Sequence, residues 1–406
     1  MYDIEKVGPN ISGKSLDKEE IKAHYDDLLN SDYDSLADFI DDNSLLLIVN
    51  DFKRATPTDL FLETLDEYLD ENNINLYDRD LNVIVATGTH DPPSEEGLKH
   101  ILGNYYDDLV SKTIIHKCKE NEHIEIGKTI RETPIKIDKN ILDYDRIINI
   151  NSVEPHYFAG FTGGRKSLLP GICHWDTIVS NHEYSLDEDA RPLSLKENPM
   201  NQDAIEAAEM IIDHIDSEIL SINSVSTSEK VYKVSAGDFF DTFESLIDRS
   251  KEIFTTEVSG KADIVIARTA APGTKNLYQS FKSFENCKHI CKDGGMLIMV
   301  SECYEGIGPR TFYDLLSSSD NPEDIFEEVY EDYPFGGHKA TNILEFLEDH
   351  DLFIVSGLDD EIIENCFCDP CQSVEEALEI AVEKLDIDEP HIVEVEEANN
   401  VVPIVK

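Results

Sequence analysis

Residues 154–171 read EPHYFAGFTGGRKSLLPG, and they follow the apolar run Ile147–Ile150. A short apolar run that ends in glycines and prolines is typical of a buried strand leading into a loop. Glycines let backbone N–H groups approach an anion closely, as loops after the strands of α/β proteins do. We therefore expect residues 154–171, called the central loop below, to form a binding site. The alternative is a tight structural turn with a solvated pair of Arg165 and Lys166.

Two further apolar runs, Leu45–Val49 and Asn82–Ala86, are also followed by polar side chains. Asp51 and Arg54 come after the first run, and His90 comes after the second. Because ligands bind in α/β proteins at the carboxyl ends of the strands, we expect these residues to line one crevice with the central loop. Taken singly, each is also explained as a helix cap, a surface arginine or a structural histidine.

The rest of the chain alternates helical and strand patterns, which predicts an α/β fold. Helices are predicted at 16–30, 56–72, from Ser94 onward, and at 173–182, 198–214, 309–317, 322–332, 338–349 and 374–385. Further strands are predicted at 114–115, 262–267, 295–300, 352–355 and 391–395. The stretch that follows residue 214 has no clear pattern. At 406 residues the chain exceeds one core, so we expect two domains, 1–260 and 261–406, with mainly parallel sheets facing a central cleft.

The composition is strongly acidic, with 85 Asp and Glu residues against 34 Lys and Arg residues and a net charge of −51. Such a charge repels nucleic acid and anionic membranes at long range, so neither is an expected partner. With 40% hydrophobic residues the chain is not expected to be disordered. We interpret the charge as a solvated, halophilic-type acidic surface suited to a salt-rich cytoplasm.

The sequence also predicts a cytoplasmic location. No apolar segment follows a basic N-terminal stretch, and no run approaches the roughly 20 apolar residues that cross a bilayer. The eight cysteines are mostly scattered, as in a reducing compartment. Only Cys366, Cys368 and Cys371 cluster. They offer soft ligands for a metal, but a fourth ligand and the usual CxxC pairs are absent, so free thiols are favoured.

The candidate loops hold histidines and cations but no nucleophile elbow, P-loop or GxGxxG motif. On the helix after strand 262–267, Gln279 and Lys282 are three residues apart and share one face, where they could bind one small anion. Cations in a crevice of so acidic a protein suggest a small anionic substrate, with His90, His156 and His182 available for proton transfer near neutral pH.

The sequence resembles the nickel-dependent lactate racemase family. The segments NDFKRATP, ATGTH, the central loop, SNHEYS, ENPMNQDAIEAA and YQSFK occur in the order and spacing of that family and cover most of the chain. One feature departs from the family, in which a tryptophan of the second domain lies over the substrate. The single tryptophan here is Trp175, in the first domain, so the substrate's side-chain pocket would involve other residues, such as Phe335.

The resemblance implies a covalent cofactor and assigns roles to the candidate residues. Lys166 would form a thioamide with pyridinium-3,5-bisthiocarboxylic acid mononucleotide, which holds nickel as a pincer, and His182 would be the nickel ligand from the protein. His90 and His156 would be the acid/base pair. The remaining implied roles are cofactor binding for Asp51, Arg54 and Tyr278, and substrate binding for Arg54, Gln279 and Lys282.

The implied reaction is racemisation or epimerisation of a small 2-hydroxy acid, lactate or a close analogue, by proton-coupled hydride transfer. The enzymes that synthesise the cofactor would be partners. Two alternatives remain. A dehydrogenase of the NAD type acts on the same acids but needs the glycine fingerprint, which is absent. A non-catalytic protein that binds the nickel cofactor would keep Lys166 and His182 but would not need a pair of basic histidines.

Overall fold

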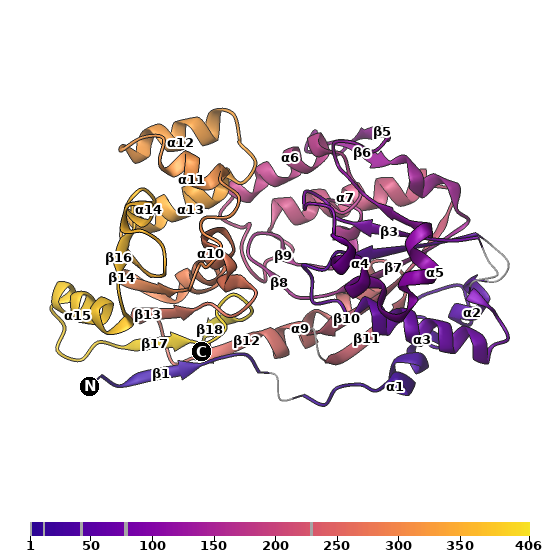
Figure 1. Cartoon of the computed structure of the whole chain (residues 1–406), viewed down its shortest axis with the longest axis horizontal. Coiled ribbons are helices and arrows are strands. Elements are labelled where there is room, and N and C mark those ends of the chain that lie inside the picture. Colours follow the sequence, from indigo (N-terminus) through magenta and orange to yellow (C-terminus); the bar gives the residue numbers. More distant parts are fainter. Residues whose placement is uncertain (1, 11–12, 41–43, 77–79, 228–229) are drawn as a thin grey trace. The chain divides into compact units, whose positions relative to one another are not determined.

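The computed structural model describes residues 2–10, 13–40, 44–76, 80–227 and 230–406. Its contacts divide the chain into two compact units. The N-terminal unit comprises Ser12–Lys251, and the C-terminal unit comprises Met1–Ile11 together with Glu252–Lys406 (Figure 1). The domain boundary predicted near residue 260 is close to this division, but the first residues of the chain belong to the C-terminal unit.

A six-stranded sheet with the order β11-β10-β7-β2-β3-β4 forms the centre of the N-terminal unit. Its strands are β2 (Leu45–Asn50), β3 (Leu81–Ala86), β4 (Thr113–Ile115), β7 (Arg146–Ser152), β10 (Glu218–Ser226) and β11 (Val231–Gly237). All neighbours are parallel except β10 and β11. Residues Leu45–Val49 of β2 are completely buried, as expected for the middle strand of a parallel sheet covered on both faces.

The helices of this unit begin with the capping signals that the sequence contains. Ser94 caps α4 by accepting from the backbone of Gly97, and Asn198 caps α7, which has a proline in its first turn. The helices are α1 (Lys18–Lys22), α2 (Leu36–Ile40), α3 (Thr58–Glu71), α4 (Glu95–Leu102), α5 (Tyr106–Leu109), α6 (Trp175–Glu183), α7 (Pro199–His214), α8 (Asp241–Glu244) and α9 (Ile247–Phe254), which contains the boundary between the units. Two small antiparallel pairs complete the unit: β5 (His123–Lys128) with β6 (Pro134–Asp138), and β8 (Pro155–His156) with β9 (Gly160–Phe161).

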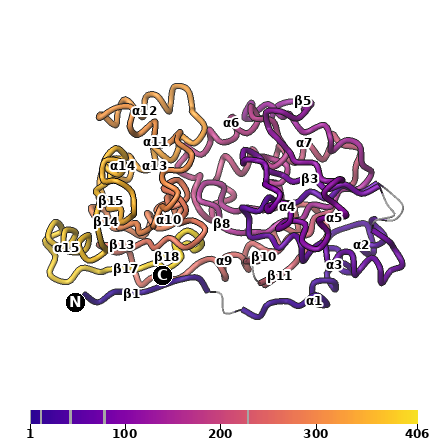
Figure 2. Tube along the Cα trace, in the orientation of Figure 1, coloured from indigo at the N-terminus to yellow at the C-terminus, as the bar shows by residue number. Residues whose placement is uncertain are grey.

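The C-terminal unit contains a second, wholly parallel sheet with the order β1-β17-β13-β14-β15-β16. Strand β1, at the start of the chain, runs beside β17 (Figure 2). The strands are β1 (Ile4–Val7), β13 (Ala262–Arg268), β14 (Cys291–Val300), β15 (Asp351–Val355), β16 (Asp369–Cys371) and β17 (Ile392–Val395), with a separate parallel pair of β12 (Thr255–Val258) and β18 (Val402–Val405). The helices are α10 (Leu277–Cys287), α11 (Thr311–Leu316), α12 (Pro322–Glu331), α13 (Gly337–Leu347), α14 (Asp360–Glu364) and α15 (Val374–Leu385).

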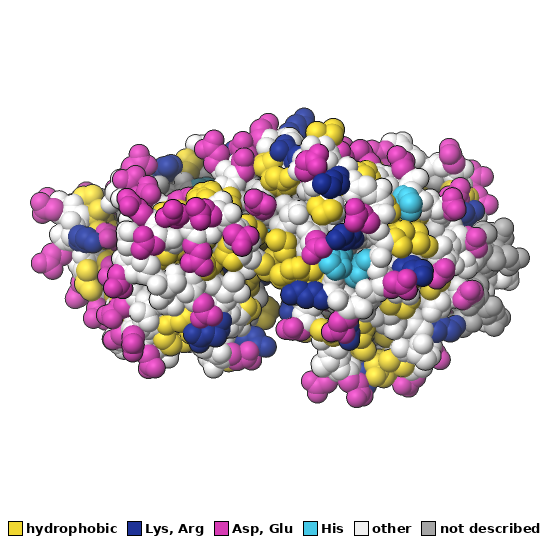
Figure 3. Space-filling view, turned by 90° about the horizontal axis from the view of Figure 1, so that it is seen from above, with side chains coloured by type: hydrophobic (Ala, Val, Ile, Leu, Met, Phe, Trp, Pro, Cys, Tyr) yellow, Lys and Arg dark blue, Asp and Glu magenta, His cyan; other side chains and the backbone are white. Residues whose placement is uncertain are grey.

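The predicted fold class, α/β with mainly parallel sheets, is confirmed. The helix predicted at 16–30 is wrong in its second half, because the chain leaves the helical path after Tyr25. The backbone of Leu29 instead bonds to Ala236 and Asp238 beside β11. None of the described helices is long and apolar enough to span a membrane. Acidic side chains are found over much of the face seen in Figure 3.

Candidate functional site

The central loop is held together from inside by Arg165. Its guanidinium is 2% exposed and donates to the carbonyl oxygens of Ala159 at 2.9 Å, Phe161 at 3.0 Å and Gly163 at 3.3 Å. Burial lowers the pKa of Arg165 to about 9, so the side chain stays cationic at neutral pH. The alternative of a solvated Arg165–Lys166 pair is therefore wrong. Arg165 therefore holds the shape of the loop.

The loop glycines allow the chain to pass close to itself. Gly160 has a φ of +73°, and a Cβ there would lie 1.9 Å from the carbonyl oxygen of Ser194. Gly163 has a φ of +84°, and its Cβ would lie 2.8 Å from the carbonyl oxygen of Ser152. L-residues rarely adopt such a conformation, and neither position has room for a side chain. In the structure these glycines thus serve close packing of the loop.

Three of the predicted site residues lie around the ring of Phe158. The Lys166 amine lies 5.4 Å from the ring centroid, the His182 ring lies 5.3 Å away and the His156 ring lies 4.5 Å away. Phe158 itself is 5% exposed. Sequence reasoning did not single it out, although the run His156-Tyr157-Phe158 between two turns was the signal available. An apolar wall of this kind reduces the solvation of the amine and the imidazole that face it.

The pKa values of Lys166 and His182 are both lowered. Burial of the amine, followed by the charges of Arg54 and Arg165, lowers the pKa of Lys166 well below its ordinary range. Burial, followed by the charge of Lys166, lowers the pKa of His182 to about 3. His182 is in the last turn of α6 and is 6% exposed. A neutral amine is a nucleophile, and a neutral imidazole is a metal ligand.

His90 and Asp51 form a hydrogen-bonded pair. The Nδ1 atom of His90 lies 2.6 Å from Oδ2 of Asp51, whose side chain is 2% exposed, whereas the His90 ring is 35% exposed. The parallel pairing of β2 with β3 brings the loops after the two strands together, which explains how residues 39 positions apart meet. Arg54 is in the same turn as Asp51, to which its backbone N–H is bonded.

Burial and the charges of the pair act together on both pKa values. Burial alone would raise the pKa of Asp51, but the hydrogen bond and charge of His90, with the charge of Arg54, lower it. Burial lowers the pKa of His90, and the Asp51 carboxylate partly opposes that shift. With Nδ1 donating to Asp51, a neutral His90 carries its lone pair on Nε2 and can accept a proton there.

His156 has the opposite arrangement. Its Nδ1 accepts a hydrogen bond from the backbone N–H of Ala159 at 3.3 Å. A neutral ring that accepts at Nδ1 carries its proton on Nε2. The two histidines assigned to proton transfer are therefore held in different tautomers by different partners.

Three predicted residues, Tyr278, Gln279 and Lys282, are in the C-terminal unit on α10, and all three are half-buried. Asn276 caps the helix by accepting from the backbone of Gln279 at 3.0 Å. Tyr278 and Lys282 are one helical turn apart, so they share a face. Beside them is a residue that sequence reasoning missed, Lys339 of α13, whose amine lies 4.6 Å from the centroid of the Tyr278 ring.

Comparison with known proteins decides the family. The model for the lactate racemase N-terminal domain matches residues 6–193, and the model for the lactate racemase C-terminal domain matches residues 258–402. A lactate racemase of Thermoanaerobacterium thermosaccharolyticum is 30% identical over 350 residues, which are 83% of this chain and 79% of that protein. The chain belongs to the lactate racemase family. The family's known members are isomerases, and this protein is therefore an enzyme of that class.

Further lactate racemase relatives agree in sequence and in structure. The lactate racemase of Lactiplantibacillus plantarum is 27% identical over 352 residues, 84% of this chain and 80% of that protein. The lactate racemase apoprotein structure from T. thermosaccharolyticum superposes with a TM-score of 0.86 at 25% identity, covering 99% of this chain and 94% of that chain. A Thermotoga maritima protein with a TM-score of 0.74 and 16% identity, covering 97% and 99% of the two chains, shares the fold.

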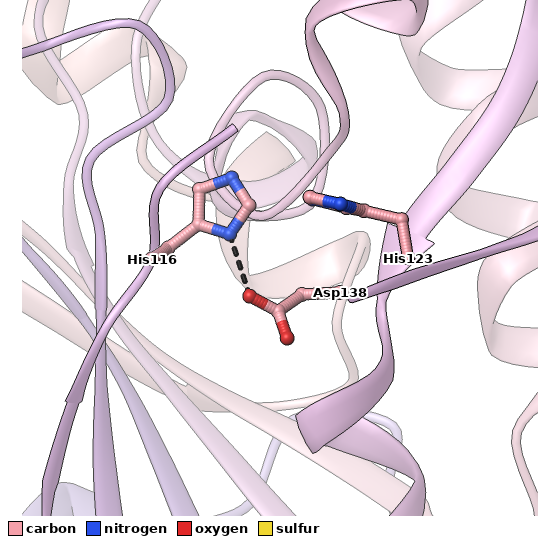
Figure 4. A group of neighbouring side chains, drawn as sticks. All are labelled: His116, His123 and Asp138. Carbon is pink, nitrogen blue, oxygen red and sulfur yellow. Dashed lines mark hydrogen bonds and ion pairs between the residues drawn. The ribbon is translucent and has the colours of Figure 1, made fainter. Parts of the chain in front are cut away.

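A second histidine cluster in this family member was not predicted. The ligand atoms of His116, His123 and Asp138 all lie within 4.8 Å of one another, and the His123 ring lies beside the pair formed by the other two (Figure 4). However, His116 uses both ring nitrogens, one toward Asp138 Oδ2 at 2.7 Å and one toward the carbonyl oxygen of Cys173 at 3.0 Å. A metal would have to break these bonds.

The cluster is better explained as a support for the site. The carbonyl oxygen of His116 accepts from the hydroxyl of Thr87 at 2.5 Å, and the backbone N–H of Gly88 donates to Gly171 at 3.0 Å. The His116 ring also bonds to the carbonyl oxygen of Cys173. Together these bonds hold the loop that carries His90 against the end of the central loop.

The clustered cysteines Cys366, Cys368 and Cys371 are free and buried. Burial raises the pKa of the Cys366 thiol to about 12 and that of the Cys371 thiol to about 11, so both are protonated at neutral pH. The Cys368 thiol donates to the carbonyl oxygen of Cys366 at 3.3 Å. The three residues are therefore buried thiols, as the sequence favoured.

Proposed function

We propose that this lactate racemase family member racemises or epimerises a small 2-hydroxy acid, lactate or a close analogue. The proposed cofactor is nickel held by pyridinium-3,5-bisthiocarboxylic acid mononucleotide, joined covalently to Lys166. The observation that carries the proposal is the pair of nitrogen donors around Phe158, the Lys166 amine and the His182 imidazole, both with lowered pKa values. A lysine or histidine on the protein surface would not be neutralised in this way.

The residues present fit this group. The pKa of the Lys166 amine is lowered, which favours the neutral form that can be acylated, and the His182 imidazole is a good ligand for nickel and stays neutral far below physiological pH. Asp51, Arg54 and Tyr278 are proposed as further cofactor contacts. When bound, the cofactor would supply an acceptor for the hydride of the 2-hydroxy acid.

The protein's own part of the reaction is proton transfer and orientation. His90, with Nδ1 donating to Asp51, is set to take the hydroxyl proton of one enantiomer at Nε2. His156 is proposed to serve the other enantiomer. Arg54 would hold the substrate carboxylate, and its charge also acts on Lys166. Substrate binding by Gln279 and Lys282 is proposed from the family resemblance.

The decisive experiment is to produce the full-length protein with the cofactor-synthesis enzymes and to measure both its intact mass and its activity. The expected result is a covalent adduct that maps to Lys166 and interconversion of D- and L-lactate, followed by chiral chromatography, without added NAD. A requirement for NAD with stoichiometric reduction would instead indicate a dehydrogenase. An adduct without conversion of any 2-hydroxy acid would indicate a cofactor-binding protein.

The remaining assignments are proposals of the same kind. We propose that the enzyme acts in the cytoplasm, that it receives its cofactor from the synthesis enzymes, and that its ligand is a small anion rather than nucleic acid or a membrane. The net charge of −51 supports the last point, because it opposes association with either polyanion.

A further inference from the structure

A fully buried carboxylate joins three segments of the N-terminal unit next to His182. Asp203, in the second turn of α7, is 0% exposed. It accepts from the hydroxyl of Thr129 at 2.6 Å, from the hydroxyl of Thr133 at 2.9 Å and from the amide of Asn181 at 2.8 Å. The two threonines flank the turn between β5 and β6, and Asn181 directly precedes His182 in the last turn of α6. Helices α6 and α7 lie beside this strand pair (Figure 1).

The three groups that donate to Asp203 are uncharged. A buried carboxylate is costly unless its oxygens are hydrogen-bonded, and here both of them are. Asn181 is also 0% exposed, and its amide donates a second time, to the carbonyl oxygen of Met200 at 3.1 Å. Both bonds of the Asn181 amide therefore join the end of α6 to the start of α7.

The two ends of α6 are held by different neighbours. Near its start, the Thr177 hydroxyl accepts from the backbone N–H of Lys136 at 3.0 Å and donates to the carbonyl oxygen of Pro134 at 2.6 Å, both on β6. At its end, Asn181 bonds to α7 instead. Adjacent residues of a helix are separated by a rotation of about 100°, so a fixed Asn181 also fixes the direction in which His182 leaves the helix.

Helix α7 also holds the central loop. Asn198, the N-cap of α7, donates from its amide to the carbonyl oxygen of Phe158 at 2.8 Å. The Phe158 ring lies 5.3 Å from the His182 ring and 5.4 Å from the Lys166 amine. The start of α7 therefore holds the apolar wall of the site directly, and it holds His182 through Asp203.

An anchor for the turn between β5 and β6 is the competing explanation, because two of the three donors come from that turn. The turn has further bonds to α7, since the backbone N–H of Ile130 donates to Glu206 at 2.8 Å and the Arg131 guanidinium donates to Gln202 at 2.7 Å. These bonds secure the turn without a buried carboxylate. An anchor for the turn also leaves the bond from Asn181 unexplained.

We propose that Asp203 is a positioning residue for His182. Through Asn181 it fixes the last turn of α6, so that the imidazole is held in the direction that a nickel ligand requires. The inference rests on the proposed function, which makes His182 the nickel ligand from the protein. A ligand that is already oriented loses less conformational freedom when the metal binds, so the metal should be held longer.

The first test measures nickel loss from the full-length protein produced with the cofactor-synthesis enzymes. Nickel content is followed by metal analysis after addition of EDTA, and the adduct on Lys166 is followed by intact mass. Asn181→Leu, which nearly keeps the size of the side chain, should raise the rate of nickel loss by about 10- to 100-fold and leave the adduct in place. Asp203→Ala should have a similar effect, and the double variant should add little, because both changes remove the same bond.

Thr129→Val is the matched control. Thr129 donates to the same carboxylate, and its hydroxyl accepts one further bond, from the backbone N–H of Thr133 at 3.2 Å. Each single variant, Thr129→Val or Asn181→Leu, thus loses two hydrogen bonds, and both should be destabilised in urea to a similar extent. Thr129→Val should nevertheless change the rate of nickel loss by less than about threefold.

Two results of this comparison would overturn the proposal. An equal acceleration in Thr129→Val and Asn181→Leu would mean that general loosening of the fold governs nickel loss. An unchanged rate in Asn181→Leu would mean that its bond to Asp203 does not act on His182. The comparison of these two variants decides even where Asp203→Ala fails to fold.

A second test uses the apoprotein and does not depend on nickel. Hydrogen exchange followed by mass spectrometry measures local opening of the backbone, and peptides that cover residues 180–186 report on the end of α6. Asn181→Leu should speed exchange in these peptides, whereas Thr129→Val should speed it only around residues 128–134. No change at 180–186 in Asn181→Leu, or the same change in both variants, would refute the assignment.

The two tests also separate this inference from the proposed function. If the full-length protein acquires neither adduct nor nickel, the proposed function fails, and hydrogen exchange still decides whether Asp203 orders the end of α6. If the wild type holds nickel and the two variants lose it at the same rate, this inference alone is wrong.

Discussion

Replacing Asp51 with asparagine should show whether the carboxylate fixes the tautomer of His90, because the His90 side chain itself is kept. The carboxylate is buried, and its Oδ2 lies 2.6 Å from Nδ1 of His90. Asparagine has the same shape but no charge, and its amide group can present N–H to the ring. The imidazole would then be free to place its proton on Nε2, where the proposed mechanism needs a lone pair.

The size of the effect follows from the type of bond that is lost. A hydrogen bond to a charged group contributes about 1.5–3 kcal/mol, and each 1.36 kcal/mol is a tenfold change in rate. Asp51→Asn should therefore lower kcat/KM by roughly 10- to 150-fold. The His90 ring is 35% exposed, so solvent screening places the expected loss toward the lower end.

The pH profile distinguishes this role from a structural one. The Asp51 carboxylate acts to raise the pKa of His90, against burial, so its removal should lower that pKa further. The acidic limb of kcat/KM, where the base must lose its proton, should then move to lower pH while the maximum falls. A limb that stays in place while the rate falls would refute the reasoning.

Stability gives an independent check on the same variant. The folded-state pKa of Asp51 is lowered, so its ionisation stabilises the fold above its unfolded pKa, and this contribution is lost as the pH falls through the folded value. The difference in unfolding free energy between wild type and Asp51→Asn should thus shrink in acid. Asp176→Asn is the matched control for activity, since Asp176 faces His174 at 3.4 Å and Lys136 at 2.7 Å on the surface and should leave the pH profile of kcat/KM unchanged.

Four further outcomes are expected. Lys166→Ala should abolish covalent retention of the cofactor, seen by intact mass, and an adduct mapped to another residue would contradict the assignment. His182→Ala should lose nickel by metal analysis while keeping the organic adduct, so full nickel occupancy would argue against its role. Arg165→Met should lower the unfolding free energy of the apoprotein by about 3 kcal/mol in urea, because three loop carbonyls lose a charged donor. The melting temperature should rise with KCl as like charges are screened, and indifference to salt up to molar concentration would count against the proposed acidic surface.

The central strands of both sheets could be predicted because they are continuous apolar runs. Strands β10 and β11 could not be predicted from the sequence. Strand β10 reads EILSINSVS, and its polar residues Ser221, Asn223 and Ser224 are completely buried. They are satisfied by side-chain bonds, such as Asn149 to Ser221 at 3.2 Å and Asn223 to Thr242 at 2.9 Å. A strand whose buried face is polar gives no apolar periodicity, so the stretch after residue 214 had no readable pattern.

For the site, chemically distinctive residues could be predicted and their surroundings could not. The positions of Asp51, His90 and Lys166 after strands follow from the strand-loop pattern. The pairing of Asp51 with His90 depends on the register of β2 against β3, and the lowered pKa of Lys166 depends on burial and on the charges of two arginines. Phe158 and Lys339 have no local signal, because an aromatic residue or a helical lysine is usually unremarkable until packing gives it neighbours.

His90 and His156 have different hydrogen-bond partners, and this difference bears on the proposed reaction. The carboxylate beside His90 favours a protonated ring, whereas Nδ1 of His156 accepts from the backbone N–H of Ala159. For His156 to take a proton at Nε2, its ring must first move its own proton to Nδ1 and give up the Ala159 bond, which at 3.3 Å is long and inexpensive to break. The two enantiomers of a free acid have equal free energy, so this asymmetry cannot change the ratio of kcat/KM between directions. Under the proposed mechanism, the asymmetry should appear instead as equal factors in kcat and KM. The enantiomer assigned to His90 would then meet a base already in the required tautomer.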